Sequence, residues 1–185
     1  YTATVDLDST YVEAFVQRAG LREVLGDMAG AEQDYSSAIR LDSDRANLYH
    51  RRAGIRYQQG AVDQAIADLD VAIGLDPSMS AVYNDRGVAY AGLGDHLLAV
   101  DEYTRALELD SEQAAAYVNR GIVYKALNNY QLALDDFDEA IRLEPISASN
   151  YTNRGNSYRD LERYEDALVG YARAIQLDPN SASAF

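Results

Sequence analysis

The sequence contains few of the residues that covalent and metal chemistry require. Its 185 residues include no cysteine, no tryptophan, three prolines, one lysine and two histidines, His50 and His96. Without cysteine the chain cannot form a disulfide, a thiolate metal site or a thiol nucleophile, and the redox compartment stays open. Phosphate-binding, dinucleotide-binding, zinc-protease and serine-hydrolase motifs are also missing. We therefore expect a non-catalytic protein with no cofactor and no metal.

The chain also has little positive charge and no long apolar run. Thirty acidic residues against 16 basic ones give a net charge of -14, which argues against nucleic acid or an anionic membrane as a partner. No stretch approaches about 18 consecutive apolar residues, so no membrane insertion is predicted. Nothing in the sequence marks a compartment, and the cytoplasm is the default assignment.

What the sequence does contain is a repeat with a period of 34 residues. Its aromatic column is Phe15, Tyr49, Tyr83, Tyr117, Tyr151 and Phe185. Arginines and alanines also recur every 34 residues. Such a period is typical of stacked units rather than of one globular domain. Thirteen of the 15 tyrosines fall in packing columns, Tyr164 among them, and only Tyr11 and Tyr57 do not. The aromatic residues are therefore expected to form a core.

Each period contains two helical patterns. Tyr83 and Tyr90 share one helix face, and Ala99, Tyr103 and Ala106 share another, as residues spaced by three, four or seven positions do. Alanine and glycine stand where the two helices are expected to cross, so the helix axes can approach closely. Each period is therefore predicted to be a helical hairpin.

Turn residues separate the paired helices. Gly94 and Asp95 stand between the two patterns, as Gly26 and Asp27 do earlier, and they predict a left-handed helix end followed by an N-cap. The second helix is expected to end before proline, because proline disfavours a helical residue before it. The sequence has three such pairs: Asp76-Pro77, Glu144-Pro145 and Asp178-Pro179.

These columns resemble the tetratricopeptide repeat (TPR), a 34-residue pattern with an aromatic residue, Gly and Tyr, then Ala-x3-aromatic, then Pro. The fourth period carries the pattern in Tyr117, Gly121, Tyr124, Ala133 and Phe137. The Asn-Arg-Gly strings look like a bacterial variety of the repeat. The resemblance covers the whole chain and implies an all-α fold, a right-handed superhelix (α-solenoid) of antiparallel helical hairpins.

The period also divides the chain into units. We predict a second-helix remnant of a preceding repeat at 1–11, five repeats at 12–45, 46–79, 80–113, 114–147 and 148–181, and the start of a following repeat at 182–185. Repeat arrays carry polar caps at both ends, and none is recognisable here. We therefore expect a fragment of a longer array, with end-to-end self-association as an alternative role.

Arginine occupies, in all five units, the column where the family has leucine. These residues are Arg18, Arg52, Arg86, Arg120 and Arg154. We expect their stems to lie along the packing stripe and their charges to pair with acids of the second helix, rather than to form a ladder for anions. The expected partners are Asp34, Asp68, Glu102 and Asp136.

Two further predictions concern the second helices and the first two units. Most of the negative charge is expected on a solvated convex face, on residues that include Asp34, Asp68, Asp70, Asp101, Asp135, Asp136, Asp138 and Glu139. Arg22 and Arg56 stand where the family has tyrosine. Their helices are expected to pack less tightly, or to rotate so that Tyr57 substitutes.

The resemblance implies that the first helices line a concave groove that holds an extended peptide or a partner helix. Helix geometry places the residues opposite the packing stripe in that groove. The candidate ligand-binding residues selected in this way are Asn47, His50, Arg51, Tyr57, Asn84, Asn119, Lys125, Asn153, Asn156 and Arg159. The charged groove positions nearly balance, so the ligand need not be basic.

Two kinds of contact are expected there. The asparagines can donate to and accept from the backbone of an extended peptide, as in the asparagine ladder of O-linked N-acetylglucosamine transferases, which they resemble. His50, Arg51 and Tyr57 would add a cationic and aromatic spot. The alternative for both sets is simple hydration of an exposed helix face.

The leading hypothesis is a non-catalytic protein-interaction scaffold whose groove binds an extended peptide or helix of a partner protein. One alternative is the substrate-recruiting arm of a larger enzyme, such as a glycosyltransferase. A self-association module is the other.

Overall fold

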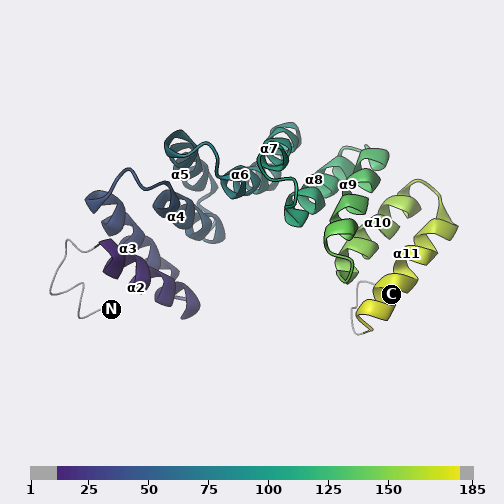
Figure 1. Ribbon diagram of the computed structural model, residues 1–185, viewed down its shortest axis with the longest axis horizontal. Helices are drawn as coiled ribbons and strands as arrows, with labels where there is room; N and C mark the ends of the chain where they lie inside the picture. The colour runs from purple at the N-terminus through teal and green to yellow at the C-terminus, as the bar shows by residue number, and fades with distance from the viewer. Residues whose placement is uncertain (1–11, 180–185) are drawn as a thin grey trace. The chain divides into compact units, whose positions relative to one another are not determined.

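The computed structural model describes residues 12–179, which form ten α-helices and no strand (Figure 1). The helices are α2 (Val12–Val24), α3 (Met28–Leu41), α4 (Ala46–Gln58), α5 (Val62–Leu75), α6 (Ser80–Leu93), α7 (His96–Leu109), α8 (Ala114–Ala126), α9 (Tyr130–Leu143), α10 (Ala148–Asp160) and α11 (Tyr164–Leu177). The all-α class and the hairpin architecture are confirmed. The helix remnant predicted at 1–11 and the repeat start predicted at 182–185 lie outside the described residues.

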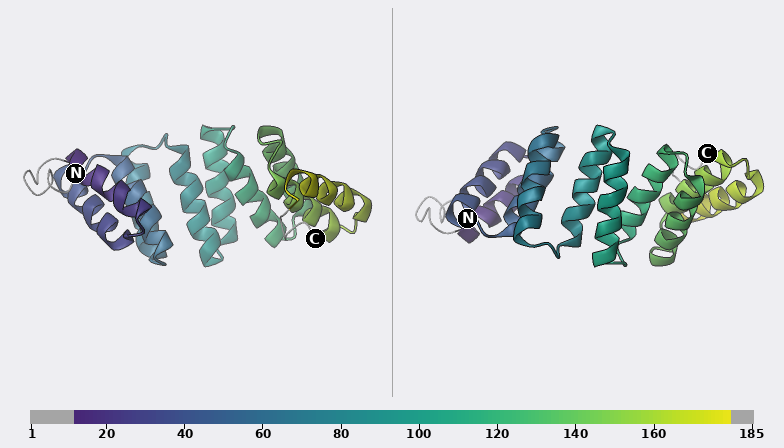
Figure 2. Two further views of the ribbon diagram at one scale, coloured as in Figure 1. Left: turned by 90° about the horizontal axis from the view of Figure 1, so that it is seen from below. Right: turned by 90° about the horizontal axis from the view of Figure 1, so that it is seen from above.

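The chain separates into two compact units, with the division inside α6 between Ala89 and Tyr90. In the first unit α2 packs against α3, α4 against α5, and α3 against α4. In the second unit α7 packs against α8, α8 against α9, α9 against α10, and α10 against α11. The two views of Figure 2 show these helices as successive antiparallel pairs.

Alanine allows the paired helices to approach closely. The two alanine columns of the second helices are almost completely buried, with no member more than 3% exposed. Glycine does the same on the first helix of the fourth hairpin, where a Cβ atom on Gly121 would lie 2.8 Å from Cε1 of Phe137. Small side chains on both helices therefore leave room for the Phe137 ring at this crossing.

The turns between paired helices use a left-handed residue, as predicted. Gly26, Gly60 and Gly94 have φ values of 78°, 81° and 85°. The same column continues with Asn128 and Glu162, at φ values of 61° and 58°. Glu162 is therefore held in a conformation that disfavours a side chain.

The predicted helix ends are confirmed in part. Asp27 caps α3 by accepting a hydrogen bond of 3.0 Å from the backbone N–H of Gly30. The equivalent prediction for Asp95 is wrong, because its side chain makes no capping hydrogen bond to α7. The second helices do end at Asp76, Glu144 and Asp178, each directly before proline.

One tyrosine departs from its predicted packing role. Tyr164, at the start of α11, is 56% exposed, whereas Tyr130 one period earlier is half-buried. Within the described range, no element covers that side of α11. The prediction that Tyr164 is a core residue is therefore wrong.

Candidate functional site

Three acidic residues expected on the solvated face are buried instead. Asp34, Asp68 and Asp136 are each 4% exposed or less. Each carboxylate accepts two hydrogen bonds from the arginine 16 residues before it. The donor-to-acceptor distances are 2.8 and 2.7 Å for Arg18 and Asp34, 2.8 and 2.7 Å for Arg52 and Asp68, and 2.9 and 2.7 Å for Arg120 and Asp136. For these arginines the predicted structural role is confirmed.

The same arginine column also reaches back to the preceding hairpin. Arg52 donates to Ser36 at 3.0 Å and Arg120 donates to Thr104 at 2.9 Å. The equivalent bonds from Arg86 to Asp70 and from Arg154 to Asp138 measure 2.6 and 2.7 Å. The acceptors form their own 34-residue column, which the sequence reasoning did not recognise. The arginines thus join successive hairpins as well as the two helices of one hairpin.

Burial and ion pairing act against each other in these pairs. Burial raises the pKa of the Asp136 carboxyl above its ordinary value, and the hydrogen bonds from Arg120 oppose that rise. In the second hairpin, hydrogen bonding to Asp68 raises the pKa of Arg52. Because a desolvated carboxylate is costly unless it is paired, the arginines are required for burial of these acids.

The two arginines that replace tyrosine strengthen the pairing in the first unit. Arg22 donates to Asp34 at 2.8 Å, and Arg56 donates to Asp68 at 2.9 Å. Arg56 also donates to Glu32 of α3 at 2.9 Å. Each buried carboxylate of the first unit therefore accepts hydrogen bonds from two arginines.

Three adjoining hollows follow the first helices of the first unit. The first hollow, of about 450 Å³, is lined by Val16, Gln17, Gly20, Leu21, Glu23, Val24, Tyr35, Asn47, Leu48 and Arg51. The central hollow, of about 510 Å³, is lined by Glu23, Asn47, His50, Arg51, Gly54, Ile55, Gln58, Met79 and Asp85. The third, which we call the socket, has about 180 Å³ and is lined by Ala53, Gly54, Tyr57, Gln58, Ala65, Leu69, Asp85, Val88 and Ala89.

Shared lining residues make these hollows one continuous surface, which we call the trough. Asn47 and Arg51 border both the first and the central hollow. Gly54 and Asp85 border both the central hollow and the socket. The trough therefore runs from α2 across α4 to α6.

Glycine leaves the floor of the trough open. A Cβ atom added to Gly20 or to Gly54 would meet nothing within 4 Å. The next residue in the same column, Val88, has a branched side chain at the edge of the socket. Glycine in this column therefore leaves room that a larger side chain would occupy.

Four predicted ligand-binding residues, Asn47, His50, Arg51 and Tyr57, line the trough. A fifth, Asn84, lies beside it and donates to the Asp85 carboxylate at 3.2 Å. The structure thus brings together the candidates of α4 and the beginning of α6.

The acidic groups of the trough are already engaged. Glu23 accepts a hydrogen bond of 2.7 Å from the Tyr35 hydroxyl, and burial together with this bond raises the pKa of Tyr35. Asp85 lies 2.7 Å from Nε2 of His50. Arg51 is exposed and forms no hydrogen bond or ion pair with any residue in the range 12–179. The trough therefore presents one cation with no counter-ion of its own.

The remaining candidates lie in the second unit, on α8 and α10, where the charged ones pair with each other. Lys125 and Arg159 both contact the Asp160 carboxylate, at 3.3 and 3.1 Å. Asn156 accepts a hydrogen bond of 2.9 Å from Tyr171. Asn119 and Asn153 are half-buried on their helices.

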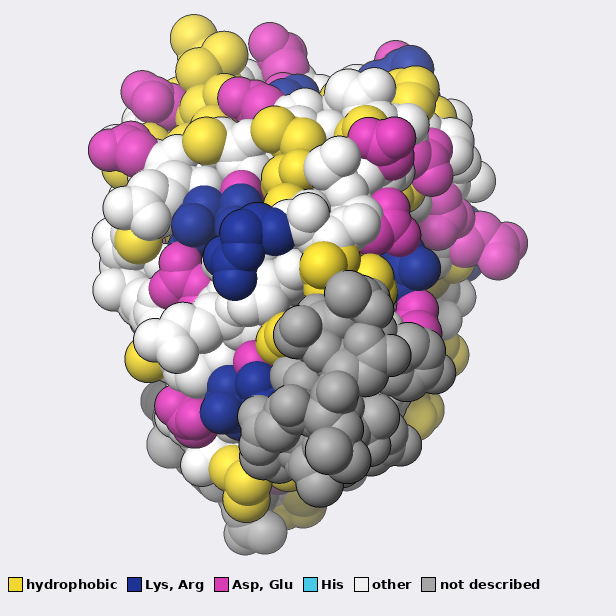
Figure 3. All heavy atoms as spheres, turned by 90° about the vertical axis from the view of Figure 1, so that its left-hand side faces the viewer, with side chains coloured by type: hydrophobic (Ala, Val, Ile, Leu, Met, Phe, Trp, Pro, Cys, Tyr) yellow, Lys and Arg dark blue, Asp and Glu magenta, His cyan; other side chains and the backbone are white. Residues whose placement is uncertain are grey.

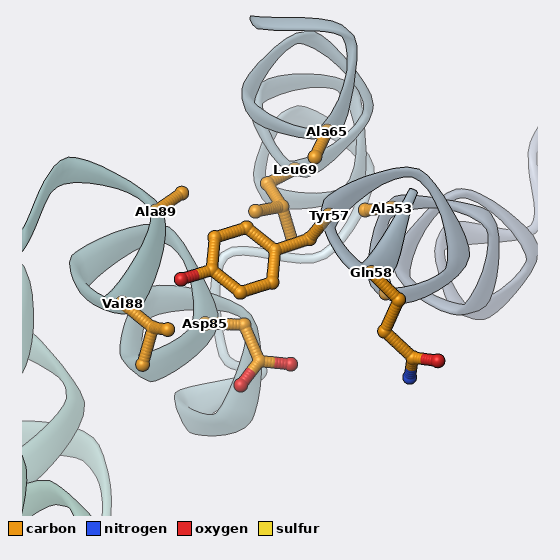
Figure 4. A pocket seen from close by; sticks show the side chains of 9 residues that line it. Ala53, Tyr57, Gln58, Ala65, Leu69, Asp85, Val88 and Ala89 are labelled. Atoms are coloured by element: carbon orange, nitrogen blue, oxygen red, sulfur yellow. The ribbon is translucent and has the colours of Figure 1, made fainter. Parts of the chain in front are cut away.

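Sequence reasoning missed the residues that form the bottom of the socket. It considered only the outward face of the first helices, whereas Ala65 and Leu69 come from α5 and Ala89 comes from the packing side of α6 (Figure 4). Two signals were present in the sequence. Arg56 replaces a tyrosine, and Leu69 stands in a column that is otherwise aromatic, at Tyr35, Tyr103, Phe137 and Tyr171.

The charges of the first unit are intermixed. Figure 3 looks onto the N-terminal end of the described chain, and there groups of basic side chains border acidic ones. No His, Asp or Glu cluster suited to a metal ion occurs among residues 12–179. The helices of that range are each too short or too polar to cross a bilayer.

Comparison with known proteins places the fold. No curated protein gives a significant sequence match. MamA from Desulfovibrio magneticus RS-1 superposes with a TM-score of 0.83 at 13% identity, over 92% of this chain and 97% of that one. YrrB, described as a TPR protein with an unusual peptide-binding site, gives a TM-score of 0.77 at 21% identity, over 99% and 94%. A chain of the APC/C hetero-tetramer Cut9-Hcn1 gives a TM-score of 0.84 at 21% identity, over 99% of this chain and 36% of that one.

Sequence profiles of the same family match nearly the whole described range. The matched residues are 16–80, 50–114, 114–146 and 148–181, each to a profile described as tetratricopeptide repeat. The chain belongs to the tetratricopeptide repeat family.

Proposed function

We propose that this chain is a non-catalytic interaction scaffold that binds an extended segment of a partner protein in the trough of its first unit. The observation that carries the proposal is the continuity of the trough across α2, α4 and α6, with Gly20 and Gly54 open along its floor. A long, narrow surface of this kind suits an extended chain better than a compact small molecule.

The polar residues of the trough support the same proposal. Asn47, which is exposed between two hollows, can donate to and accept from a peptide backbone. In our proposal Asn84 makes such contacts beside the trough, and Asn119, Asn153 and Asn156 make contacts of the same kind on the first helices of the second unit. YrrB, which has this fold, is described as having a peptide-binding site, which is consistent with a peptide ligand here.

The proposal can be tested with random 12-residue peptides selected against the immobilised 185-residue chain. Selected peptides are then titrated against the wild type and the double variant Gly20→Leu/Gly54→Leu. A Cβ atom at either position meets nothing within 4 Å, so the leucine side chains extend into the trough, and leucine also favours the helix over glycine by about 1 kcal/mol. We expect the double variant to bind at least tenfold more weakly.

The matched control is Gly74→Leu. Gly74 is also an exposed glycine of a helix, and a Cβ atom there meets nothing within 4 Å, but it lies on α5 away from the trough. The control should bind as the wild type does. Failure to select any peptide, or equal binding by the double variant, would refute the proposed function.

A further inference from the structure

We propose that the trough recognises a peptide by one aliphatic side chain inserted in the socket and an acidic side chain placed beside it at Arg51. This inference rests on the proposed function and names the chemistry of its ligand. Two observations support it. The second hairpin lacks aromatic residues that the other hairpins have, and Arg51 in the adjoining hollow forms no ion pair with a described residue.

The socket exists because two rings are missing from the same place. Arg56 replaces the tyrosine found at Tyr90, Tyr124 and Tyr158, and Leu69 replaces an aromatic ring. Arg56 does not occupy the vacated space, because its guanidinium is held by Asp68 and Glu32. The first hairpin also has arginine in that column but keeps Tyr35, which is 3% exposed. Of the five hairpins, only the second lacks both rings.

The walls of the socket are mostly apolar, with Gln58 and Asp85 as the polar lining residues, and its bottom is fixed by the core. Leu69, Ala65 and Ala89 are each 2% exposed or less, so they belong to the packed interior. Figure 4 shows the Tyr57 ring projecting from α4 between α5 and α6, with Val88 on the opposite wall. An apolar cavity of about 150 Å³ can hold a benzene-sized group, so a cavity of about 180 Å³ accepts one Leu, Ile, Val or Met side chain.

A guanidinium without an ion pair defines the neighbouring contact. Arg51 borders both larger hollows and forms no ion pair in the described part of the chain, whereas Glu23 and Asp85 are occupied by Tyr35 and His50. A guanidinium presents a planar pair of donors that matches a carboxylate. A ligand that runs along the trough through the central hollow can therefore place an Asp or Glu side chain against Arg51 and the aliphatic side chain in the socket.

The experiment uses the peptides selected on the wild-type chain. It measures whether the loss of binding caused by a substitution in the peptide depends on a substitution in the protein. We expect the selected sequences to share one aliphatic residue and one acidic residue. Alanine in place of the aliphatic residue should weaken binding to the wild type about 10- to 100-fold, as expected for loss of a buried side chain. The same peptide change should have almost no further effect on Gly54→Leu, because leucine at the edge of the socket has already blocked it.

Gly20→Leu is the comparison variant, since it narrows the first hollow and leaves the socket open. On this variant, replacing the aliphatic residue of the peptide by alanine should still weaken binding about 10- to 100-fold. Val88→Phe fills the socket from α6 and should reproduce the result of Gly54→Leu. For the acidic residue, replacement by its amide should weaken binding to the wild type and leave binding to Arg51→Gln unchanged.

Selected peptides without a shared aliphatic residue, or an alanine effect of equal size on wild type and Gly54→Leu, would overturn the inference. If the amide change weakens binding to the wild type but not to Arg51→Gln, the acidic part is supported, and an equal loss on both chains would overturn it. If such peptides still lose binding to Gly20→Leu/Gly54→Leu, the proposed function stands while its ligand chemistry does not. If no peptide binds at all, both fail.

Discussion

The buried Asp–Arg pairs allow a sharp comparison between two chemically identical substitutions. Asp136 accepts hydrogen bonds from Arg120 alone among the described residues, whereas Asp68 accepts from both Arg52 and Arg56. Arg120→Leu and Arg52→Leu each restore the leucine that the family has at this position. Only the first leaves its carboxylate without a cation.

The expected magnitudes follow from that difference. Removing one partner from a buried ion pair costs about 3–5 kcal/mol, because the other charge stays buried and unpaired. Asp68 would keep the 2.9 Å bond from Arg56, and a hydrogen bond to a charged group contributes about 1.5–3 kcal/mol. We therefore expect Arg120→Leu to destabilise its hairpin by about 2 kcal/mol more than Arg52→Leu destabilises its own.

The assay is hydrogen exchange of the backbone amides, read separately for residues 46–75 and 114–143. Repeat arrays unfold unit by unit, so a single free energy of unfolding would mix the hairpins. Exchange in each hairpin reports its own opening free energy. Urea unfolding followed by circular dichroism at 222 nm provides the global comparison.

The loss in Arg120→Leu should also depend on pH. Burial already raises the pKa of Asp136, and removal of Arg120 takes away the group that opposes this rise. An acid whose folded-state pKa exceeds its unfolded value is stabilising below the unfolded pKa, and that stability is lost as pH rises through the folded pKa. The penalty should therefore be full at neutral pH and shrink as pH falls toward the ordinary value of about 3.9 for aspartate.

Two outcomes would refute the reasoning. Equal losses for Arg120→Leu and Arg52→Leu would mean that the second arginine does not protect the buried carboxylate. The double variant Arg120→Leu/Asp136→Leu removes both charges, and such replacement is often neutral or stabilising. If it were no more stable than Arg120→Leu alone, the unpaired charge would not be the cause of the loss.

Three smaller predictions concern the hairpins themselves, each read by hydrogen exchange of the backbone amides in the hairpin concerned. Glu162→Gly should stabilise by about 1 kcal/mol, since it relieves the left-handed strain, and Asn128→Gly should gain less than half of that because asparagine tolerates this conformation. Gly121→Ala should destabilise, because overpacking against the buried ring of Phe137 costs about 1–3 kcal/mol and outweighs the helix gain of about 1 kcal/mol; combined with Phe137→Leu, the total loss should be smaller than the sum of the two. Asp27→Ala should cost about 1 kcal/mol through the lost cap of α3, and no change there would mean that the cap does not contribute.

Much of the fold was predictable because it depends on local periodicity. The two alanine columns, the left-handed turns at Gly26 and Gly94, and the helix ends before proline all follow from residues close in sequence. A helix face is set by spacing alone. The hairpin architecture therefore needed no knowledge of long-range contacts.

The burial of charge was harder to predict. Asp34 and Asp70 belong to the same kind of helix, yet the first is buried and the second exposed. Which acid turns inward depends on whether an arginine of the same hairpin or of the next one reaches it. The partners 16 positions after an arginine were expected from the sequence, whereas acceptors 16 positions before one, such as Asp70, are brought within reach only by the packing of successive hairpins.

The candidate site illustrates the same limit. The positions of Asn47, His50 and Arg51 followed from the outward face of α4, and all three line the trough. The socket did not follow, because it is formed by what the core lacks. A missing ring leaves a cavity only when no neighbouring side chain moves into the space, which depends on where the replacement side chain is held.

That dependence links stability to the proposed recognition in the second hairpin. The substitution that gives Asp68 its second arginine is the one that removes a tyrosine from the socket, since Arg56 serves the carboxylate and leaves the ring position empty. The first hairpin has the same substitution at Arg22 and no equivalent socket, because Tyr35 remains in its core. Closing the socket by returning tyrosine to position 56 would therefore also take one cation from Asp68. The proposed ligand site and the second arginine of Asp68 therefore depend on the same residue.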